Sequence, residues 1–178
     1  GLGFDQHICI NADAAEFSNP EFFDVVSNLL AQHQIAAHQL HIEVTESSLM
    51  KRHSNVKEQL NLLKALGVCL ALDDFGTGYA SLSYLQEYPF DFIKIDKSFI
   101  SKITADKTQR AIVNAILALA EALDMQVIAE GIENEQQRDL LLAMGSQYGQ
   151  GYWFGKPMSA EVTTNMLMQQ HLSKNNND

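Results

Sequence analysis

The chain has 178 residues, of which 46% are hydrophobic, and it carries 12 Lys and Arg against 22 Asp and Glu. This composition indicates one soluble globular domain and excludes a disordered chain, while the net charge of -10 argues against binding duplex nucleic acid through its phosphates. Because no segment reaches the roughly 18 uninterrupted apolar residues of a membrane span, and the first residues do not resemble a secretion signal, we expect a cytoplasmic chain or the cytoplasmic part of a larger membrane-anchored protein.

Short apolar runs alternate along the chain with longer stretches that carry apolar residues at helical spacing. The predicted strands are 7–10, 40–44, 68–72, 92–95, 126–129 and a weaker one at 146–149. The predicted helices are 20–32, 55–66, 108–123, 135–144 and 160–172. Gly67 and Gly145 follow two of these helices, where a residue at positive φ is common. Apolar strands separated by helices predict a parallel sheet covered by helices.

About six βα units fit this alternation. An open doubly wound sheet would accommodate six, whereas a closed (βα)8 barrel needs eight units and usually about 250 residues. An open sheet gathers its functional residues at one switch point, but here nearly every predicted strand ends in a polar or charged residue. The distribution therefore favours an α/β fold of the TIM-like (βα)8 barrel type, of which about six βα units are present in this chain.

Seven acidic residues stand at or just beyond the C-terminal ends of the predicted strands. They are Glu43, Glu46, Asp73, Asp74, Asp96, Glu130 and Glu133. Asn11 ends the first strand in the same way. Carboxylates in such a ring repel one another unless a cation lies among them, and a ligand set made only of oxygen favours Mg²⁺, Mn²⁺ or Ca²⁺ over zinc. The pattern predicts a hard divalent metal site; the alternative is that each acid caps a helix or solvates a strand end.

Asp73 and Asp74 are the most informative of these acids, because neighbouring carboxylates could hold two ions and share one ligand. Two metals about 3.5–4 Å apart are the arrangement that cleaves phosphodiesters. Lys94 stands two residues before Asp96 and is expected on the same inner face. It could orient an attacking water, help to deprotonate it, or neutralise a phosphate oxygen.

Two glycine-containing segments could approach a ligand. Gly76-Thr77-Gly78 follows the aspartate pair, although an ordinary βα turn has the same pattern. Segment 149–154 carries three aromatic residues, which could stack on a base or pack at the end of the barrel. Neither pattern alone decides between a functional and a structural role.

Six motifs in order give these features a common explanation. They are Ile10-Asn11-Ala12, Ile42-Glu43-Val44-Thr45-Glu46-Ser47, Asp73-Asp74-Phe75-Gly76-Thr77-Gly78-Tyr79-Ala80-Ser81-Leu82, Ile93-Lys94-Ile95-Asp96, Ala129-Glu130-Gly131-Ile132-Glu133 and Gly149-Gln150-Gly151-Tyr152. Across essentially the whole chain they resemble the EAL domain, the cyclic di-GMP phosphodiesterase. The resemblance implies a TIM-like barrel that hydrolyses cyclic di-GMP to linear pGpG with two Mg²⁺ or Mn²⁺ ions.

The resemblance also implies residue roles. The residues that resemble metal ligands are Asn11, Glu43, Asp73, Asp74 and Glu130. The residues that resemble catalytic positions are Lys94, which would act on the nucleophilic water, Glu130, and Glu46, which would hold the loop 74–81. The residues that resemble substrate-binding or supporting positions are Asp96, Glu133, Gln150, Gly76, Thr77 and Gly78. The partners implied are cyclic di-GMP, a second copy that docks through the loop 74–81, and an upstream sensor or cyclase domain.

The Glu-Ala-Leu signature of the family belongs on a strand upstream of Asn11 and is not in the chain. Glu121-Ala122-Leu123 has these letters but is predicted to end a helix. We therefore expect residues 1–172 to form an N-terminally incomplete EAL domain and residues 173–178 a disordered tail. Two alternatives stay open: a catalytically inactive EAL module that acts as a cyclic di-GMP receptor or protein-interaction domain, and an enolase-like Mg²⁺-dependent barrel with Lys94 as base.

Overall fold

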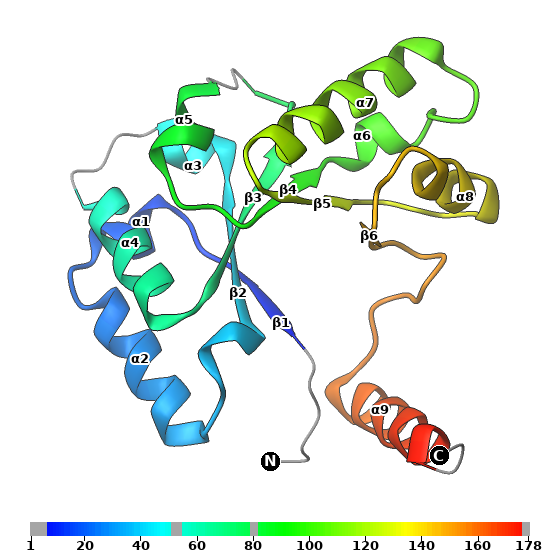
Figure 1. Cartoon of the computed structure of the whole chain (residues 1–178). Coiled ribbons are helices and arrows are strands. Elements are labelled where there is room, and N and C mark those ends of the chain that lie inside the picture. Colours follow the sequence, from blue (N-terminus) through cyan, green and yellow to red (C-terminus); the bar gives the residue numbers. More distant parts are fainter. Residues whose placement is uncertain (1–6, 51–54, 79–81, 176–178) are drawn as a thin grey trace.

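A computed structural model of the chain describes residues 7–50, 55–78 and 82–175 (Figure 1). Six strands in these ranges form one sheet, in which every neighbouring pair is parallel. They are β1 (Ile8–Asn11), β2 (Leu40–Thr45), β3 (Cys69–Phe75), β4 (Phe92–Ile95), β5 (Gln126–Ala129) and β6 (Tyr148–Gly149). Their order in the sheet equals their order in the chain, whereas a doubly wound sheet would reverse its order at a switch point. The sheet is therefore six strands of a TIM-like barrel.

Nine helices accompany the strands in the described residues. They are α1 (Ala14–Ser18), α2 (Phe22–His33), α3 (Glu46–Met50), α4 (Val56–Leu66), α5 (Leu82–Glu87), α6 (Lys97–Ile100), α7 (Lys107–Ala122), α8 (Glu135–Ala143) and α9 (Ala160–Asn175). A 3-10 turn at Ala37–Gln39 precedes β2. Helices α1 to α8 lie around the outside of the curved sheet, and α9 stands apart at the end of an extended segment (Figure 1). We predicted a disordered tail at residues 173–178, but helix α9 includes residues 173–175. Residues 176–178 lie outside the described ranges.

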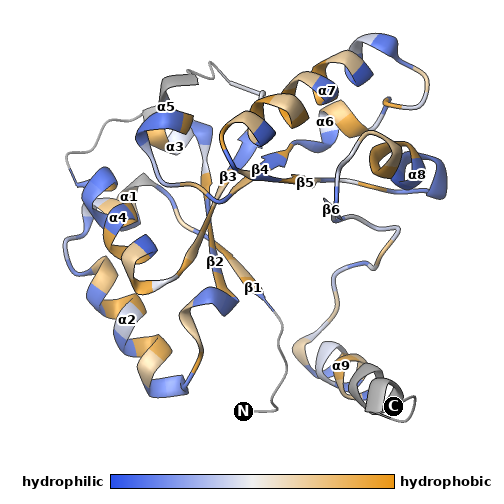
Figure 2. Cartoon of the chain, viewed as in Figure 1, coloured by the Kyte–Doolittle hydropathy of each residue, from blue (hydrophilic) through white to orange (hydrophobic). Residues whose placement is uncertain are grey.

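The outer face of the sheet and the helices make the hydrophobic core. Six side chains from β2, β3 and β4 are each at most 1% exposed there. They are Ile42, Val44, Leu70, Leu72, Ile93 and Ile95. In Figure 2 the apolar colour extends along these strands and onto the helices beside them. Because successive side chains of a strand point to opposite faces, the residues between these six, including Glu43 and Lys94, point to the inner face.

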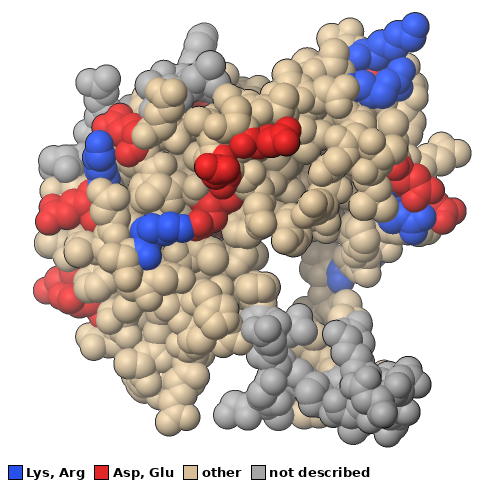
Figure 3. All heavy atoms as spheres, viewed as in Figure 1, with Lys and Arg blue, Asp and Glu red and all other residues tan. Residues whose placement is uncertain are grey.

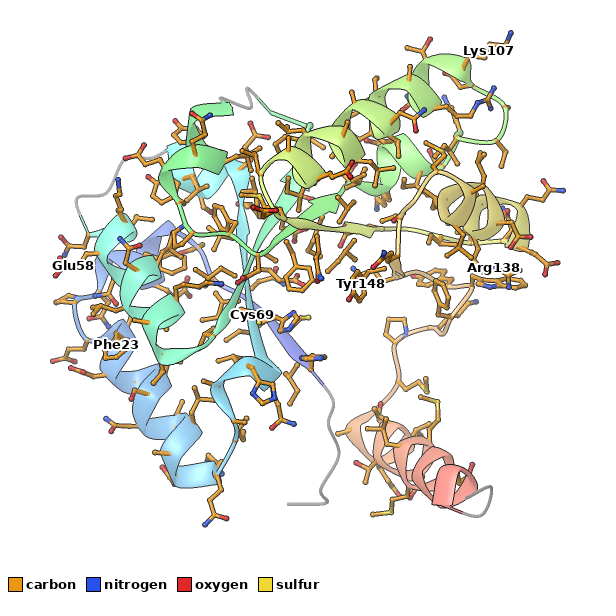
Figure 4. All side chains as sticks on the ribbon, in the orientation of Figure 1. Phe23, Glu58, Cys69, Lys107, Arg138 and Tyr148 are labelled. Atoms are coloured by element: carbon orange, nitrogen blue, oxygen red, sulfur yellow. The ribbon has the colours of Figure 1, made fainter. Side chains whose placement is uncertain are left out.

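The inner face carries a row of rings at the N-terminal end of the strands. The ring of His41 lies 5.1 Å from that of Phe92, and the ring of Phe92 lies 6.1 Å from that of Tyr148. These residues come from β2, β4 and β6, as in a layer of a barrel interior, which alternate strands fill. Figure 4 labels Tyr148, which is 46% exposed, so the inner face is less covered than the outer one.

The distribution of charged side chains on the surface agrees with the excess of acidic over basic residues in the sequence. On the face drawn in Figure 3, basic side chains form no continuous stripe and acidic side chains stand in small groups. Among the helices of the described ranges, none is both long and apolar enough to cross a bilayer.

Candidate functional site

Lys94 lies at the centre of an acidic cluster on the inner face, near the C-terminal ends of β2 to β5. Its Nζ lies 2.6 Å from Glu43 Oε2, 3.1 Å from Asp73 Oδ1 and 2.7 Å from Glu130 Oε1. The lysine side chain is only 3% exposed. The strands explain this meeting, because they are parallel and adjacent and so bring their C-terminal ends to one edge.

The charges of the cluster do not balance. Burial disfavours the ammonium of Lys94, but its hydrogen bonds with Glu130 and Glu43 outweigh burial and raise the pKa of Lys94 above its ordinary value. Burial also raises the pKa of Glu130 and of Asp74, and the negative charge of Asp73 adds to both shifts. One ammonium therefore faces more carboxylates than it can neutralise, which is the condition under which a further cation binds.

A β-bulge brings Asp73 and Asp74 together. The register of β3 against β4 shifts between Leu72 and Phe75, and Asp74 adopts the left-handed conformation with φ 56°. The backbone N–H of Asp74 donates to Asp73 Oδ1 over 2.9 Å. Both aspartates thus lie within β3, which runs on to Phe75, rather than beyond its end as the strand predicted at 68–72 would have it.

Three carboxylates in this arrangement fit one divalent cation. One oxygen each from Asp73, Asp74 and Glu130 lie within 4.8 Å of one another. All three donors are carboxylate oxygens, the type that Mg²⁺ and Mn²⁺ prefer. Asn11 is placed beside Glu43 by the register of β1 on β2, at the same end of the sheet.

Glu46 occupies a different position, under the loop that follows β3. Glu46 is the first residue of α3 and is only 3% exposed. Neither of its carboxylate oxygens has a hydrogen-bond partner among the described residues. A Cβ added to Gly78 would lie 3.0 Å from Glu46 Oε1, so the loop passes directly over the carboxylate. Gly76, at φ 93°, and the bond from Thr77 Oγ1 to the Asp74 carbonyl shape the turn before it. The rest of the predicted loop, residues 79–81, lies outside the described residues.

The supporting residues predicted from the sequence separate into two groups. Gln150 reaches the cluster, because its Nε2 donates to Glu130 Oε1 over 2.5 Å. Asp96 instead caps α6 by accepting from the backbone N–H of Ser98, and these bonds hold its pKa below the ordinary range although burial opposes the shift. Glu133 is exposed and lines a neighbouring cavity.

That cavity has a volume of about 630 Å³ and lies beside Glu130 and Gln150. Tyr152 also lines it, together with Lys97 and Lys156, two cations that the strand-end pattern did not single out. Lys156 Nζ lies 5.6 Å from the centre of the Tyr152 ring. The sequence could have pointed to these two lysines as candidate site residues, because Lys97 follows the strand-end acid Asp96 and Lys156 follows the aromatic segment 149–154.

Segment 149–154 is tied to α8 and to the chain after Glu130. In Figure 4, Arg138 projects from α8, and its guanidinium lies 5.5 Å from the ring centre of Trp153. Gly151 packs so closely on Ile132 that an added Cβ would overlap the Ile132 backbone. The exposed aromatics Tyr152 and Phe154 are therefore held by backbone packing rather than by burial of their rings.

Comparison with known proteins places this chain in a family. A profile of the EAL domain matches residues 2–157. MucR of Pseudomonas aeruginosa, a bifunctional diguanylate cyclase/cyclic di-GMP phosphodiesterase, is 40% identical over 157 residues, which are 88% of this chain and 23% of MucR. Signaling protein YkoW of Bacillus subtilis is 38% identical over 168 residues, which are 94% of this chain and 21% of YkoW. The chain thus spans about a quarter or less of the length of these relatives.

Solved structures agree with the sequence comparison. The MucR phosphodiesterase in complex with c-di-GMP has a TM-score of 0.83 at 40% identity, and the match covers 89% of this chain and 64% of that one. The EAL domain of Mycobacterium smegmatis DcpA has a TM-score of 0.86 at 31% identity and is matched over 92% of this chain and 73% of its own. The half-barrel is therefore part of the TIM-like barrel of these domains, and the chain belongs to the EAL domain family.

Proposed function

We propose that this chain supplies the metal-binding and substrate-binding residues of a phosphodiesterase that hydrolyses cyclic di-GMP to linear pGpG. The observation that carries the proposal is the meeting of Lys94 with the carboxylates of Glu43, Asp73 and Glu130 at one edge of the sheet. It is supported by similarity to a phosphodiesterase whose structure was solved with c-di-GMP.

The proposed cofactor is a pair of Mg²⁺ or Mn²⁺ ions. Asp73, Asp74 and Glu130 would hold one ion, and Asn11, Glu43 and Asp73 would hold the other. Two bound divalent ions stabilise charge on a transferring phosphoryl group and make water a better nucleophile. Asp73 belongs to both sets, so its carboxylate is the proposed bridge.

The remaining residues of the cluster would position and deprotonate the attacking water. Lys94 is the buried cation nearest to the carboxylates and would orient that water or neutralise a phosphate oxygen. Glu130, a proposed metal ligand, would also act on the water as a catalytic residue, and the hydrogen bond from Gln150 orients its carboxylate. Glu46 would hold the loop 74–81 by accepting hydrogen bonds from it.

The cavity beside Glu130 is the proposed substrate pocket. Its volume of about 630 Å³ lies within the range of small-molecule sites, about 300–1,000 Å³. Tyr152 could stack on a guanine base, while Lys97 and Lys156 could face phosphate oxygens. Glu133 would support the pocket wall, Asp96 would support it by fixing the start of α6, and Gly76, Thr77 and Gly78 would form the loop at its rim.

We also propose two partners for the whole protein. A second copy would dock through the loop 74–81, of which Gly78 lies against Glu46. An upstream sensor or cyclase domain is supported by MucR, which is bifunctional and of which this chain covers 23%.

The test of the proposed function is product analysis. The chain is incubated with cyclic di-GMP and Mn²⁺, and the nucleotides are separated by chromatography, with a parallel reaction in excess EDTA. We expect linear pGpG with Mn²⁺ and none with EDTA. Binding of cyclic di-GMP without any product at saturating Mn²⁺, both by this chain and by a longer chain that restores the upstream Glu-Ala-Leu strand, would contradict hydrolysis and support the receptor alternative.

A further inference from the structure

The ammonium of Lys94 makes three close ion pairs inside the cluster. A lysine ammonium has three N–H donors and no acceptor. Its three partners are Glu43, Asp73 and Glu130, which come from three segments of the chain, and all three contacts are 3.1 Å or shorter. The ammonium is thus directed toward carboxylate oxygens, with a hydrogen bond to Glu43 and ion pairs with Asp73 and Glu130, rather than toward a water molecule or a phosphate oxygen.

The same carboxylates are the ones that a metal would need. Asp73 and Glu130 belong both to the contacts of Lys94 and to the three-carboxylate group that fits one cation. Glu43 is in contact with Lys94 and is a proposed ligand of the other ion. An ammonium and a divalent cation are both hard positive groups, so they compete for these oxygens.

We infer that Lys94 is the internal counterion of the metal-free site, and that a divalent metal binds by exchange, taking carboxylate contacts from Lys94 and releasing at least one of its N–H donors. This inference rests on the proposed function, because it assumes that the cluster takes a metal.

The exchange has two consequences for the site. Without metal, Lys94 holds together carboxylates that would otherwise repel one another, so the site is kept in shape before the metal arrives. With metal, the freed donor becomes available to orient the attacking water. Lys94 thereby links loading of the metal to positioning of the water, and it weakens metal binding because its contacts must first be broken.

The first test compares Mn²⁺ binding by the chain, by Lys94→Met and by Lys57→Met. Methionine keeps most of the length of lysine without its charge. Lys57 pairs with Glu87 at the surface and controls for the loss of one positive charge. We expect Lys94→Met to bind Mn²⁺ at least about tenfold more tightly in titration calorimetry, since a like charge next to a cation is strongly unfavourable, and Lys57→Met to bind as the unchanged chain does.

Thermal unfolding of the same proteins tests the counterion role. In EDTA we expect Lys94→Met to unfold at least about 4 °C below the unchanged chain, and saturating Mn²⁺ to remove most of that difference. Lys57→Met should show neither effect. Equal or weaker Mn²⁺ binding by folded Lys94→Met would overturn the inference.

A measurement on the unchanged chain covers the case in which Lys94→Met does not fold without metal. The ¹⁵Nζ signal of Lys94 is followed by NMR during titration with diamagnetic Mg²⁺. We expect a slowly exchanging ammonium in EDTA, and a shifted signal with faster hydrogen exchange at saturating Mg²⁺. An ammonium signal that stays unchanged while Mg²⁺ binds would show that Lys94 gives up no contact, which overturns the exchange.

The outcomes separate the inference from the proposed function. If the unchanged chain binds Mn²⁺ and Lys94→Met binds it no better, only the inference fails. If neither protein binds Mn²⁺, both fail. If only Lys94→Met binds Mn²⁺, Lys94 is confirmed as the competitor and the metal-dependent function of the unchanged chain is contradicted.

Discussion

Asp74 decides which side chains meet at the end of β3. In a regular strand Asp73 and Asp74 would point to opposite faces, and only one carboxylate would reach the inner face. The left-handed conformation of Asp74, at φ 56°, and the register shift next to it turn both toward Glu130. Aspartate adopts this conformation more readily than most residues, and bulges of this kind occur next to active sites.

The first prediction at this scale concerns the shared ligand. Asp73→Asn keeps the shape of the side chain and removes the charge proposed to bridge two ions. We expect at least about a hundredfold loss of cyclic di-GMP turnover, because two-metal stabilisation contributes several kcal/mol, together with weaker Mn²⁺ binding. The control is Asp139→Asn, an exposed carboxylate that pairs with Arg138. Turnover by Asp73→Asn equal to that of the control would contradict the bridging role.

The second prediction uses Cys9, which reports on the charge of Glu43. Burial, and then the charge and hydrogen bond of Glu43, raise the pKa of Cys9 to about 11. Only the thiolate reacts with iodoacetamide, so the alkylation rate should keep rising with pH to about 11, well past the ordinary cysteine value of about 8.5. The burial of Cys9 is only partial, because the residue as a whole is exposed, so slow reaction reflects its protonation rather than lack of access. Mass spectrometry of a Cys69→Ser variant gives the rate, and a plateau by pH 9 would contradict the shift.

At the scale of elements, the strands and the long helices could be predicted, and the short helices could not. All six strands and the five helices α2, α4, α7, α8 and α9 lie where alternation and helical spacing put them, within a few residues. Gly67 and Gly145 end helices at φ 99° and 96°, as predicted. Helices α1, α3, α5 and α6 have four to six residues, too few to show a helical period.

The candidate site was likewise predictable only in part. The acids at the strand ends could be predicted to converge, because parallel strands end at one edge, and Glu43, Asp73, Asp74 and Glu130 do so. The bulge at Asp74 could not be predicted, since it depends on how β3 packs against β4. A cap and a ligand look alike in sequence, and for this reason the structural role of Asp96 became visible only in its bond to Ser98.

The prediction for the elements concerns two glycines that follow β6. At Gly151 an added Cβ would overlap the backbone of Ile132, whereas at Gly155 it would make only an ordinary contact, 3.6 Å from Met158 Cε. We expect Gly151→Ala to lower the free energy of unfolding by at least about 2 kcal/mol, and Gly155→Ala to change it little. Urea unfolding followed by circular dichroism measures both. Equal stability of the two variants would show that Gly151 can move away from Ile132.

At the scale of the whole molecule, the described sheet has a covered centre and open edges. Its outer face is buried under the helices along β2 to β4, whereas Ile8 of β1 is 57% exposed and Tyr148 of β6 is 46% exposed. These strands are the two edges of the described sheet. Edge strands bond to a neighbour on one side only and offer their free backbone groups to other chains.

This asymmetry predicts a gradient of backbone stability. Amides of β3 and β4, which have paired strands on both sides, should exchange with deuterium most slowly, and those of β1 and β6 should exchange fastest among the strands. Hydrogen exchange followed by mass spectrometry on overlapping peptides resolves the strands. Protection of β1 equal to that of β3 would contradict an open edge and would indicate that another segment or chain covers it.

The most direct test of the central claim, that the strand-end carboxylates form a metal centre, is anomalous diffraction. Crystals of the chain grown with Mn²⁺ are measured on both sides of the manganese absorption edge. We predict an anomalous peak at coordination distance from oxygens of Asp73, Asp74 and Glu130, with a second peak toward Glu43 and Asn11. Peaks only at surface carboxylates, or no peak at saturating Mn²⁺, would contradict the account.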